Sequence, residues 1–369
     1  MSFINKYLRN FKPYKVASHK VWLVNEEERK KILKLDWNES TNEPTPLVKE
    51  RIMNLLNNNE FFHLYPATYN QELLDLLSKY VGLPVENIQY FGSSDSLHEY
   101  IAKMYINVGD PVLILGPSYD NFRLTAEVNG ASVFFFEFNE DFTFDKDSFE
   151  AMINKINPSL VYICNPNNPT GYVHSKSYIE SLVCKFSETV FLVDEAYYEF
   201  SGVTVSDLVL DHENLLVSRT MSKAFALANF RFGYLIASKK NVDYISSIRN
   251  PKNITTFAQE ATIAALSDID YMKKYVKEVN EAKAYFINEI NTNFKEYFYA
   301  YQSAGNFVLL NCFDRDRKNR FDEYMKSKDI YLRKVDHSQL LYTCIRISIG
   351  TLEQMKRVLN EMKNFINEQ

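Results

Sequence analysis

Between residues 218 and 233 the chain contains the stretch Ser218-Arg-Thr-Met-Ser-Lys223-Ala-Phe-Ala-Leu-Ala-Asn-Phe-Arg231-Phe-Gly233. Hydroxyl groups at Thr220 and Ser222 stand beside Lys223, and Arg231 follows eight residues later. The neighbouring residues are mostly small or apolar, which predicts a lysine that is partly buried or lines a cleft. Burial disfavours the charged form of an amine and lowers its pKa. A neutral lysine amine can attack an aldehyde.

The same stretch also offers groups that bind a phosphate. The hydroxyls of Thr220 and Ser222 can form hydrogen bonds with it, and the Arg231 guanidinium can hold two of its oxygens at once. A small molecule with both an aldehyde and a phosphate is pyridoxal phosphate (PLP), so the stretch predicts a PLP site. The alternative is that Lys223 is an ordinary surface lysine at a helix start. The rest of the chain has to decide between them.

Polar residues follow the ends of several apolar strands in the preceding part of the chain. Strands and helices alternate from residue 88 to residue 217, which predicts βαβ units and a mostly parallel sheet covered on both faces. Ligands of such sheets bind beyond the carboxyl ends of the strands. The residues at these ends are Gly92, Tyr119, Asn168, Asp194 and Ser222. Their recurrence favours one composite site.

After residue 237 the pattern changes to long helices followed by a few strands, which predicts a separate α+β domain. We expect helices at 239–250, 256–267, 270–295 and 352–367, and strands at 306–311, 330–333 and 343–349. The predicted organisation is an N-terminal arm at 1–34 that joins the small domain, a large PLP-binding domain at 35–245 and a small C-terminal domain at 246–369.

The composition of the 369 residues favours a soluble cytoplasmic protein. The net charge of −5 and the lack of a long basic run give no reason to expect nucleic-acid binding. No apolar run approaches the roughly 20 residues that span a bilayer, and the N-terminal residues do not resemble a signal peptide. The four cysteines and six histidines are scattered, without the spacing of a metal site or a disulfide framework.

PLP makes further demands that residues at the strand ends can meet. Its pyridine nitrogen needs a carboxylate partner to stay protonated, and Asp194 ends a buried strand. Asn168 and Tyr197 can bond the phenolic oxygen O3′, and Tyr119 can stack on the ring. The turn Gly92-Ser93-Ser94 opens a helix whose backbone amides can bind the phosphate. Singly, each of these residues also has an ordinary structural explanation, such as a turn, a helix cap or a core tyrosine.

Together the motifs resemble those of the fold type I PLP-dependent aminotransferases. Asn-Pro-Thr-Gly at 168–171, Asp-Glu-Ala-Tyr at 194–197 and Ser-Lys-Ala-Phe at 222–225 follow one another in the order of that superfamily. Within it the chain is most similar to the histidinol-phosphate aminotransferases. The shared features are Thr-x-Ser-Lys-Ala-Phe-Ala-Leu-Ala, Tyr65-Pro66, Asn38-Glu39, Pro13-Tyr14, Arg333 and Arg346-Ile-Ser-Ile-Gly350. The resemblance covers essentially the whole chain and implies a homodimer with sites at its interface.

The resemblance also implies a role for each matched residue. The catalytic residues would be Lys223, which forms a Schiff base and moves a proton, Asp194 at the pyridine nitrogen, and Tyr197. The cofactor would be bound by Ser93, Ser94, Tyr119, Asn168, Asp194, Tyr197, Thr220, Ser222, Lys223 and Arg231, joined by Tyr65 of the partner subunit. The substrate would be bound by Tyr14, Asn38, Arg333 and Arg346, with Arg346 at an anionic group and Arg333 and Tyr14 at a phosphate.

Three functions fit this set of residues. The first is an aminotransferase for a small phosphorylated amine or keto compound, like histidinol phosphate or smaller, such as a serinol and dihydroxyacetone phosphate pair, with glutamate and 2-oxoglutarate as co-substrates. The second is a decarboxylase of phosphoserine or phosphothreonine. The third, a PLP-binding regulator without activity, is disfavoured because Lys223 is intact and no DNA-binding domain is appended.

The chain departs from the histidinol-phosphate aminotransferase pattern at two places. The usual Gly-Ala/Ser-Asp/Asn-Glu turn is replaced by Gly92-Ser-Ser-Asp-Ser, and the usual Gly-Leu-Arg by Asn229-Phe230-Arg231. Both lie near the expected cofactor or substrate entrance. They therefore bear on the identity of the substrate more than on PLP.

Overall fold

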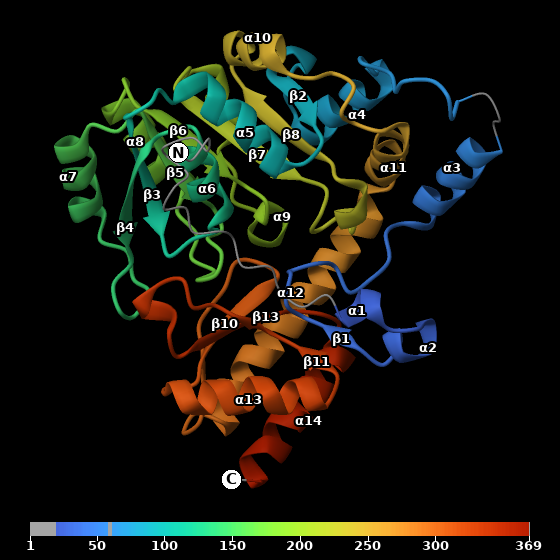
Figure 1. Ribbon diagram of the computed structural model, residues 1–369, viewed down its shortest axis with the longest axis vertical. Helices are drawn as coiled ribbons and strands as arrows, with labels where there is room; N and C mark the ends of the chain where they lie inside the picture. The colour runs from blue at the N-terminus through green and yellow to red at the C-terminus, as the bar shows by residue number, and fades with distance from the viewer. Residues whose placement is uncertain (1–19, 58–60, 369) are drawn as a thin grey trace, which may run out of the picture.

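A computed structural model describes residues 20–57 and 61–368, and a seven-stranded sheet lies at the centre of its larger part (Figure 1). The strands are β2 (Ile88–Phe91), β3 (Pro111–Gly116), β4 (Ser132–Glu137), β5 (Leu160–Cys164), β6 (Val190–Asp194), β7 (Leu215–Thr220) and β8 (Gly233–Ala237). Their order is β2-β8-β7-β6-β5-β3-β4. Only β8 runs antiparallel to its neighbours, so the predicted α/β class with a mostly parallel sheet is confirmed.

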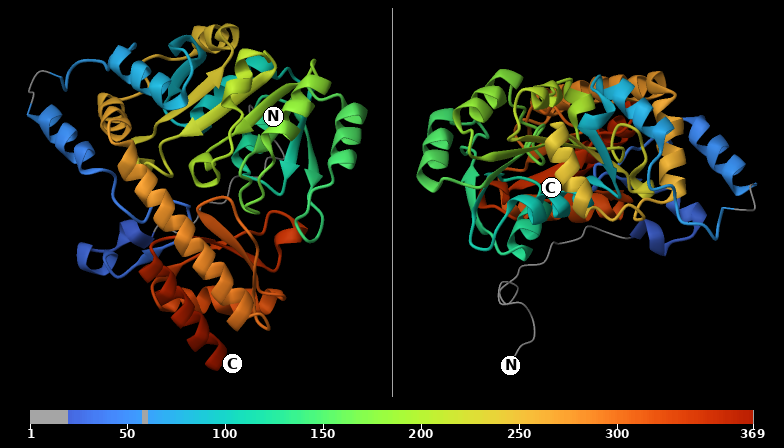
Figure 2. Two further views of the ribbon diagram at one scale, coloured as in Figure 1. Left: turned by 180° about the vertical axis from the view of Figure 1, so that it is seen from behind. Right: turned by 90° about the horizontal axis from the view of Figure 1, so that it is seen from above.

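The central strands are apolar because helices cover both faces of the sheet. Every side chain of β5 and β7 is buried. The covering helices are α5 (Ser94–Tyr105), α6 (Asn121–Val128), α7 (Lys146–Ile156), α8 (Lys176–Lys185), α9 (Tyr198–Ser201) and α10 (Lys239–Ile248), with short 3-10 turns η2 (Val85–Asn87), η3 (Ser206–Leu210) and η4 (Ala228–Phe230). Helices α5 and α6 lie in front of the sheet in Figure 1, whereas α8 comes to the front in the view from behind (Figure 2).

A smaller part of the molecule combines the beginning of the described chain with its end. Strand β1 (Leu33–Lys34) pairs in parallel with β11 (Ile330–Tyr331). An antiparallel sheet has the order β12-β13-β10-β9. Its strands are β9 (Tyr299–Ala300), β10 (Phe307–Asn311), β12 (Arg333–Lys334) and β13 (Cys344–Ser348), and the accompanying helices are α1 (Lys20–Leu23), α2 (Glu26–Arg29), α13 (Arg315–Ser327), η5 (Gln339–Leu341) and α14 (Leu352–Asn367).

The long helix α12 (Ile269–Asn293) joins the two parts. It contacts α9 beside the large sheet and β9, β10 and α14 in the smaller part. At about 1.5 Å per residue its 25 residues span roughly 38 Å. Helix α11 (Thr256–Leu266) precedes it and packs on α3 (Pro46–Leu56) and α4 (Gln71–Val81). The domain boundary near residue 245 stays a prediction, because α11 lies beyond it in sequence yet contacts helices of the larger part.

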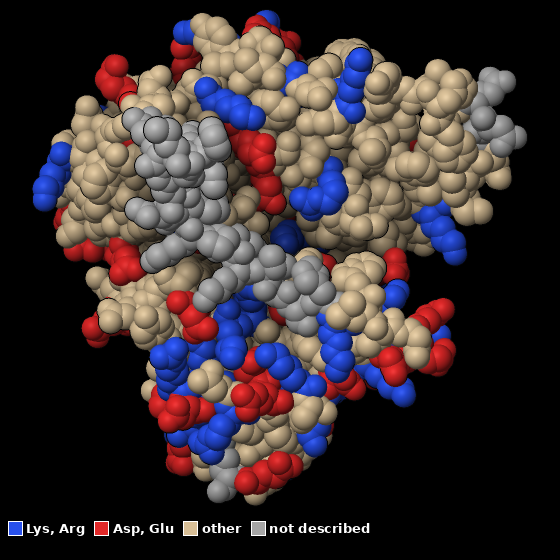
Figure 3. All heavy atoms as spheres, in the orientation of Figure 1, with Lys and Arg blue, Asp and Glu red and all other residues tan. Residues whose placement is uncertain are grey.

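Charge is unevenly distributed over the face drawn in Figure 3. Lysine, arginine, aspartate and glutamate side chains gather over the lower region that holds α13, whereas the upper region over the large sheet is mostly uncharged. Within the described ranges, no helix combines the length and the apolar character that crossing a membrane requires.

Candidate active site

Lys223 lies in the loop that follows β7, and its amine points at a backbone carbonyl. Nζ donates a hydrogen bond to the carbonyl oxygen of Trp37 at 3.0 Å. Burial, and after it the positive charge of Arg346, lower the pKa of Lys223 from 10.5 to about 8. Such a change raises the neutral fraction of the amine at pH 7 about 300-fold. The half-buried side chain is therefore far more nucleophilic than a surface lysine.

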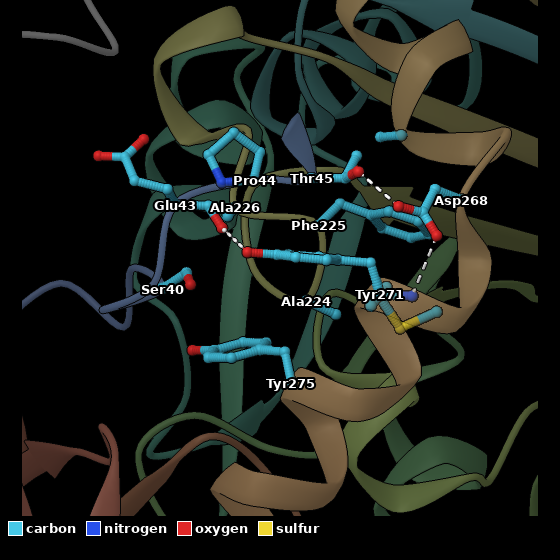
Figure 4. Close-up of a pocket in the computed structure, with 12 residues that line it drawn as sticks. Ser40, Glu43, Pro44, Thr45, Ala224, Phe225, Ala226, Asp268, Tyr271 and Tyr275 are labelled. Carbon is cyan, nitrogen blue, oxygen red and sulfur yellow. Dashed lines mark hydrogen bonds between the residues drawn. The ribbon is translucent and has the colours of Figure 1, made fainter. Parts of the chain in front are cut away.

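The loop after this lysine is packed between an N-terminal segment and the start of α12 (Figure 4). Residues 224–226 line a small cavity together with residues of 40–45 and of α12. Thr45 Oγ1 donates to Asp268 Oδ2 at 2.5 Å, and the Asp268 carboxylate also caps α12. The hydroxyl of Tyr271 donates to the carbonyl of Glu43 at 3.2 Å. These contacts join the segment that carries Trp37 to the helix that supports the lysine loop.

Asp194 ends β6 in the middle of the sheet, and its buried carboxylate receives three hydrogen bonds. The Tyr162 hydroxyl donates to Oδ2 at 2.8 Å, while the Ala196 backbone amide and the Ser218 hydroxyl donate to Oδ1 at 3.2 and 3.3 Å. An ionised carboxylate only accepts hydrogen bonds, so three donors match it and fix its orientation. Tyr162 was missed in the sequence analysis because it lies within a fully apolar strand.

Tyr197 is the centre of a polar network that joins the two parts of the molecule. Its hydroxyl oxygen accepts hydrogen bonds from Asn38 Nδ2 at 3.2 Å and from Asn168 Nδ2 at 3.1 Å. Asn168 Oδ1 in turn accepts from an Arg346 guanidinium nitrogen at 2.7 Å. Burial raises the pKa of Tyr197. The phenol therefore keeps its proton and, with both lone pairs engaged, can donate it to a third group.

The turn before α5 lies beside strand β8, next to the end of β7. Ser93 is the N-cap of α5, and its Oγ accepts the Ser96 backbone amide at 3.0 Å. Gly233 in β8 lies so close that a Cβ there would be 2.3 Å from the Ser94 backbone nitrogen. A side chain at Gly233 would therefore displace the start of α5. Strand pairing places Thr220 directly opposite Gly233, so the hydroxyl stretch and the helix N-terminus meet.

Hydroxyl and guanidinium groups surround this helix N-terminus. Thr220 Oγ1 donates to Ser222 Oγ at 2.9 Å and accepts the Ser222 backbone amide at 3.1 Å. Arg231 is exposed and approaches Asp95, in the first turn of α5, to 3.8 Å. Hydroxyls, backbone amides and a guanidinium around a helix N-terminus make a site for a phosphate.

Arg333 and Arg346 occupy directly opposite positions on the antiparallel strands β12 and β13. Side chains of such a pair project from the same face of the sheet, and like charges there are unfavourable. Arg346 also donates to the carbonyl of Asp36 and is buried. An anion between or beside the two guanidinium groups would offset their repulsion.

His337, four residues after Arg333, was not among the predicted site residues. Burial lowers its pKa, Arg333 and Arg346 lower it further, and Asp120 acts in the opposite direction. These influences place His337 near the two arginines and the loop after β3. Its only signal in the sequence is its short distance from Arg333.

Three further tyrosines were predicted to bind the cofactor or the substrate, and the structure describes two of them. Tyr119 follows β3, the neighbour of β5, and is partly exposed. Tyr65 is 78% exposed, and Lys252 Nζ lies 4.4 Å from the centre of its ring. No hydrogen bond or ring contact in the described ranges joins Tyr65 to the other site residues. Tyr14 lies outside the described residues.

Comparison with known proteins gives this geometry a family context. The family described as aminotransferase class I and II matches residues 30–362. A dihydroxyacetone phosphate transaminase of Campylobacter jejuni is 38% identical, over 99% of this chain and 98% of the relative. A histidinol-phosphate aminotransferase of Ruminiclostridium cellulolyticum is 32% identical, over 97% of both chains. The crystal structure of histidinol-phosphate aminotransferase from Sinorhizobium meliloti, in complex with pyridoxal-5'-phosphate, superimposes with a TM-score of 0.88 at 23% identity, over 100% of this chain and 98% of that one.

Proposed function

The chain belongs to the aminotransferase class I and II family, and we propose that it transfers an amino group between glutamate and a small phosphorylated keto compound of the dihydroxyacetone phosphate type. PLP-dependent transamination follows from the family. The substrate class is supported by the C. jejuni relative, which matches nearly the whole chain and is a dihydroxyacetone phosphate transaminase. The observation that carries the proposal is that Arg333 and Arg346 lie directly opposite each other on β12 and β13, with Arg346 hydrogen-bonded to Asn168.

The donor set of the site fits PLP at each of its polar groups. Lys223 offers an amine of lowered pKa for the aldehyde, and Asp194 offers a carboxylate held by three donors for the pyridine nitrogen. Tyr197 offers a phenol proton for O3′. The phosphate would be bound at the α5 N-terminus. Its ligands would be Ser93, Ser94, Thr220, Ser222 and Arg231.

When bound, PLP withdraws electrons from the substrate carbon and carries the amino group between the two half-reactions. The protein has to supply a base, orient the substrate and stabilise the positive charge of the protonated pyridine nitrogen. Lys223 would take the proton from the substrate carbon and return it. Asp194 would hold the pyridine nitrogen in its protonated form. Asn38 ties the N-terminal segment to Tyr197, and so to the residues that would surround the ring.

The arginine pair supports a short substrate with two polar ends. Opposite residues on antiparallel strands have Cα atoms about 4.5–5.5 Å apart. Arg346 reaches Asn168, which is bonded to Tyr197, so an anion bound by Arg346 lies near the reacting carbon. Arg333 stands one strand further out on the edge strand β12. This arrangement suits the glutamate α-carboxylate at Arg346 and a substrate phosphate at Arg333.

A two-step absorbance experiment tests this function. L-glutamate should convert the purified holoenzyme to its pyridoxamine form, and dihydroxyacetone phosphate should restore the aldehyde form faster than the keto partner of histidinol phosphate does. A preference for the imidazole compound would refute the three-carbon substrate. Failure of glutamate to convert the cofactor, together with carbon dioxide release from phosphoserine or phosphothreonine, would establish the decarboxylase instead.

We also propose that the active form is a homodimer. Large apolar side chains are exposed together on α3 and on the segment from 61 to 69. Such a group of exposed apolar residues is typical of an interaction surface, whereas isolated ones are common on any protein. They are Leu47, Met53, Leu56, Phe62, Leu64, Tyr65 and Tyr69. A second copy that covers this surface would bring Tyr65 to the neighbouring phosphate site. Light scattering of the holoenzyme should give twice the 43.2 kDa chain mass, and a monomeric mass with full activity would contradict the proposal.

A further inference from the structure

A buried histidine reaches the Asp194 carboxylate through one serine. His98 lies on α5, its side chain is fully buried, and its Nε2 is 2.9 Å from Ser218 Oγ. Ser218 Oγ is in turn the hydroxyl that donates to Asp194 Oδ1 at 3.3 Å. Neither residue is among those expected to bind the substrate. Both residues lie in the core, where an apolar side chain would be less costly to bury, so the presence of two polar side chains here needs an explanation.

The surroundings of His98 decide which of its ring nitrogens carries the proton. The ring packs edge-on against Phe122 and Tyr162, with centroids 5.6 and 5.8 Å away. Nδ1 is buried and has no hydrogen-bond partner in the part of the chain that the structure describes. A proton there would be a buried donor without an acceptor, which is costly. This favours the tautomer that carries its proton on Nε2.

This tautomer sets the direction of the whole chain of hydrogen bonds. A serine hydroxyl has one proton and can accept two hydrogen bonds. If Nε2–H donates to Ser218, the serine proton is directed to Asp194. If Nε2 instead accepted the serine proton, Asp194 Oδ1 would keep only the backbone amide of Ala196 as a donor. His98 thus determines how many donors the carboxylate has, although it does not touch it.

We propose that His98 is a positioning residue for the cofactor, acting through Ser218 to hold Asp194 as an ionised, fixed carboxylate at the pyridine nitrogen. The inference rests on the proposed role of Asp194. A carboxylate that loses a donor becomes a better proton acceptor. It then competes with the pyridine nitrogen for the proton, so the electron-withdrawing power of the ring and the retention of the cofactor both decrease.

Variants of the two residues test the link directly. His98→Phe keeps an aromatic ring without hydrogen-bonding groups, and Ser218→Ala removes the connecting hydroxyl. Ser218→Ala should slow the glutamate half-reaction and speed release of PLP from the holoenzyme about 10-fold, the size expected for one hydrogen bond to a charged group. His98→Phe keeps the serine hydroxyl but removes the donor that orients it, so its effect should go in the same direction and be no larger. KM for glutamate should change less than kcat. The double variant should be no worse than Ser218→Ala alone, because His98 acts on Asp194 only through Ser218; additive losses would overturn the proposal.

Two matched variants separate positioning from packing. His98→Gln restores a donor near the Nε2 position and should recover most of the PLP retention that His98→Phe loses. His174→Phe alters another fully buried histidine, which packs among Phe144 and Tyr172 and has no bond to Asp194. It should leave PLP release unchanged. Faster release from His174→Phe, equal to that of His98→Phe, would show a general packing effect and overturn the proposal.

The tautomer of His98 can also be observed in the parent protein, so this test does not depend on a variant that folds. The chain has six histidines, so 15N-histidine spectra of the holoenzyme are simple enough to assign. The His98 signal should show a protonated Nε2 and a bare Nδ1. The opposite tautomer would overturn the inference while leaving transamination intact. Conversely, failure of the glutamate conversion would refute the proposed function without altering this spectrum.

Discussion

Ser93 stands in a backbone conformation that its side chain disfavours. Its φ of 137° and ψ of 166° lie in a region that glycine almost alone occupies, and such a residue stores about 1–3 kcal/mol of strain. Ser93→Gly relieves this strain. Two effects oppose this gain. Loss of the side-chain cap to Ser96 costs a few tenths of a kcal/mol when glycine takes the N-cap position, and the greater conformational freedom of glycine in the unfolded chain destabilises the fold by about 0.4–1 kcal/mol. The net result is a stabilisation of about 1 kcal/mol.

Thermal unfolding of the cofactor-free protein measures this gain without a contribution from ligand binding. A chain of 369 residues has an unfolding entropy of about 0.8 kcal/mol/K, so about 1 kcal/mol raises Tm by roughly 1.3 °C. Ser94→Gly is the matched control, because Ser94 is the first residue of α5 and glycine has a lower helix propensity than serine by about 0.5 kcal/mol. Ser93→Gly should raise Tm and Ser94→Gly should lower it, so that the two variants differ by roughly 2 °C. A Tm for Ser93→Gly as low as that of Ser94→Gly would refute the strain at this turn.

Four further predictions concern the site. Lys223→Ala should abolish the visible absorbance of the lysine-bound cofactor; persistent absorbance would contradict its role. Loading of the cofactor-free protein should accelerate as pH rises towards about 8 and level off above it, because the neutral amine attacks and the pKa of Lys223 is lowered to about 8; a flat rate between pH 6 and about 8 would contradict this. Arg333→Ala should raise KM for the phosphorylated substrate at least about tenfold more than KM for glutamate, the effect of losing a charged hydrogen bond; equal losses would remove the phosphate pocket. Mixed dimers of Tyr65→Ala and Lys223→Ala should regain one intact site and about half the activity; no recovery would place Tyr65 in its own subunit's site.

Much of the fold could be predicted from the sequence because its apolar residues recur at regular spacings typical of strands and helices. The apolar strands, the helices between them and the late change to long helices all appear in the structure near the expected bounds. Strand β8 was not predicted. Its five residues follow the Arg231 loop and contain a glycine, which gave no strand signal by themselves. Its antiparallel direction between β2 and β7 arises from tertiary pairing, which no local pattern encodes.

The sequence predicts site residues where the chemistry depends on the type of side chain, and it does not indicate residues whose contacts depend on their position in the fold. Motif order led to Lys223 and Asp194, but the carbonyl of Trp37 that accepts from the lysine is backbone and could come from any residue. His98 has no motif of its own. Its relation to Asp194 exists only because α5 packs against β7, bringing residues 120 positions apart within hydrogen-bond distance.

Asn168 makes the cofactor and substrate halves of the site dependent on each other. A single amide accepts from Arg346 at 2.7 Å and donates to Tyr197 at 3.1 Å. When Arg346 turns towards a substrate anion, the amide loses a charged donor on one side, and its polarisation towards Tyr197 on the other side weakens. If Tyr197 donates to O3′ as proposed, its proton would respond to whether Arg346 holds a substrate anion. Since Arg346 comes from the small sheet and Asn168 and Tyr197 follow the ends of β5 and β6, this amide is also one of the contacts between the two parts of the molecule.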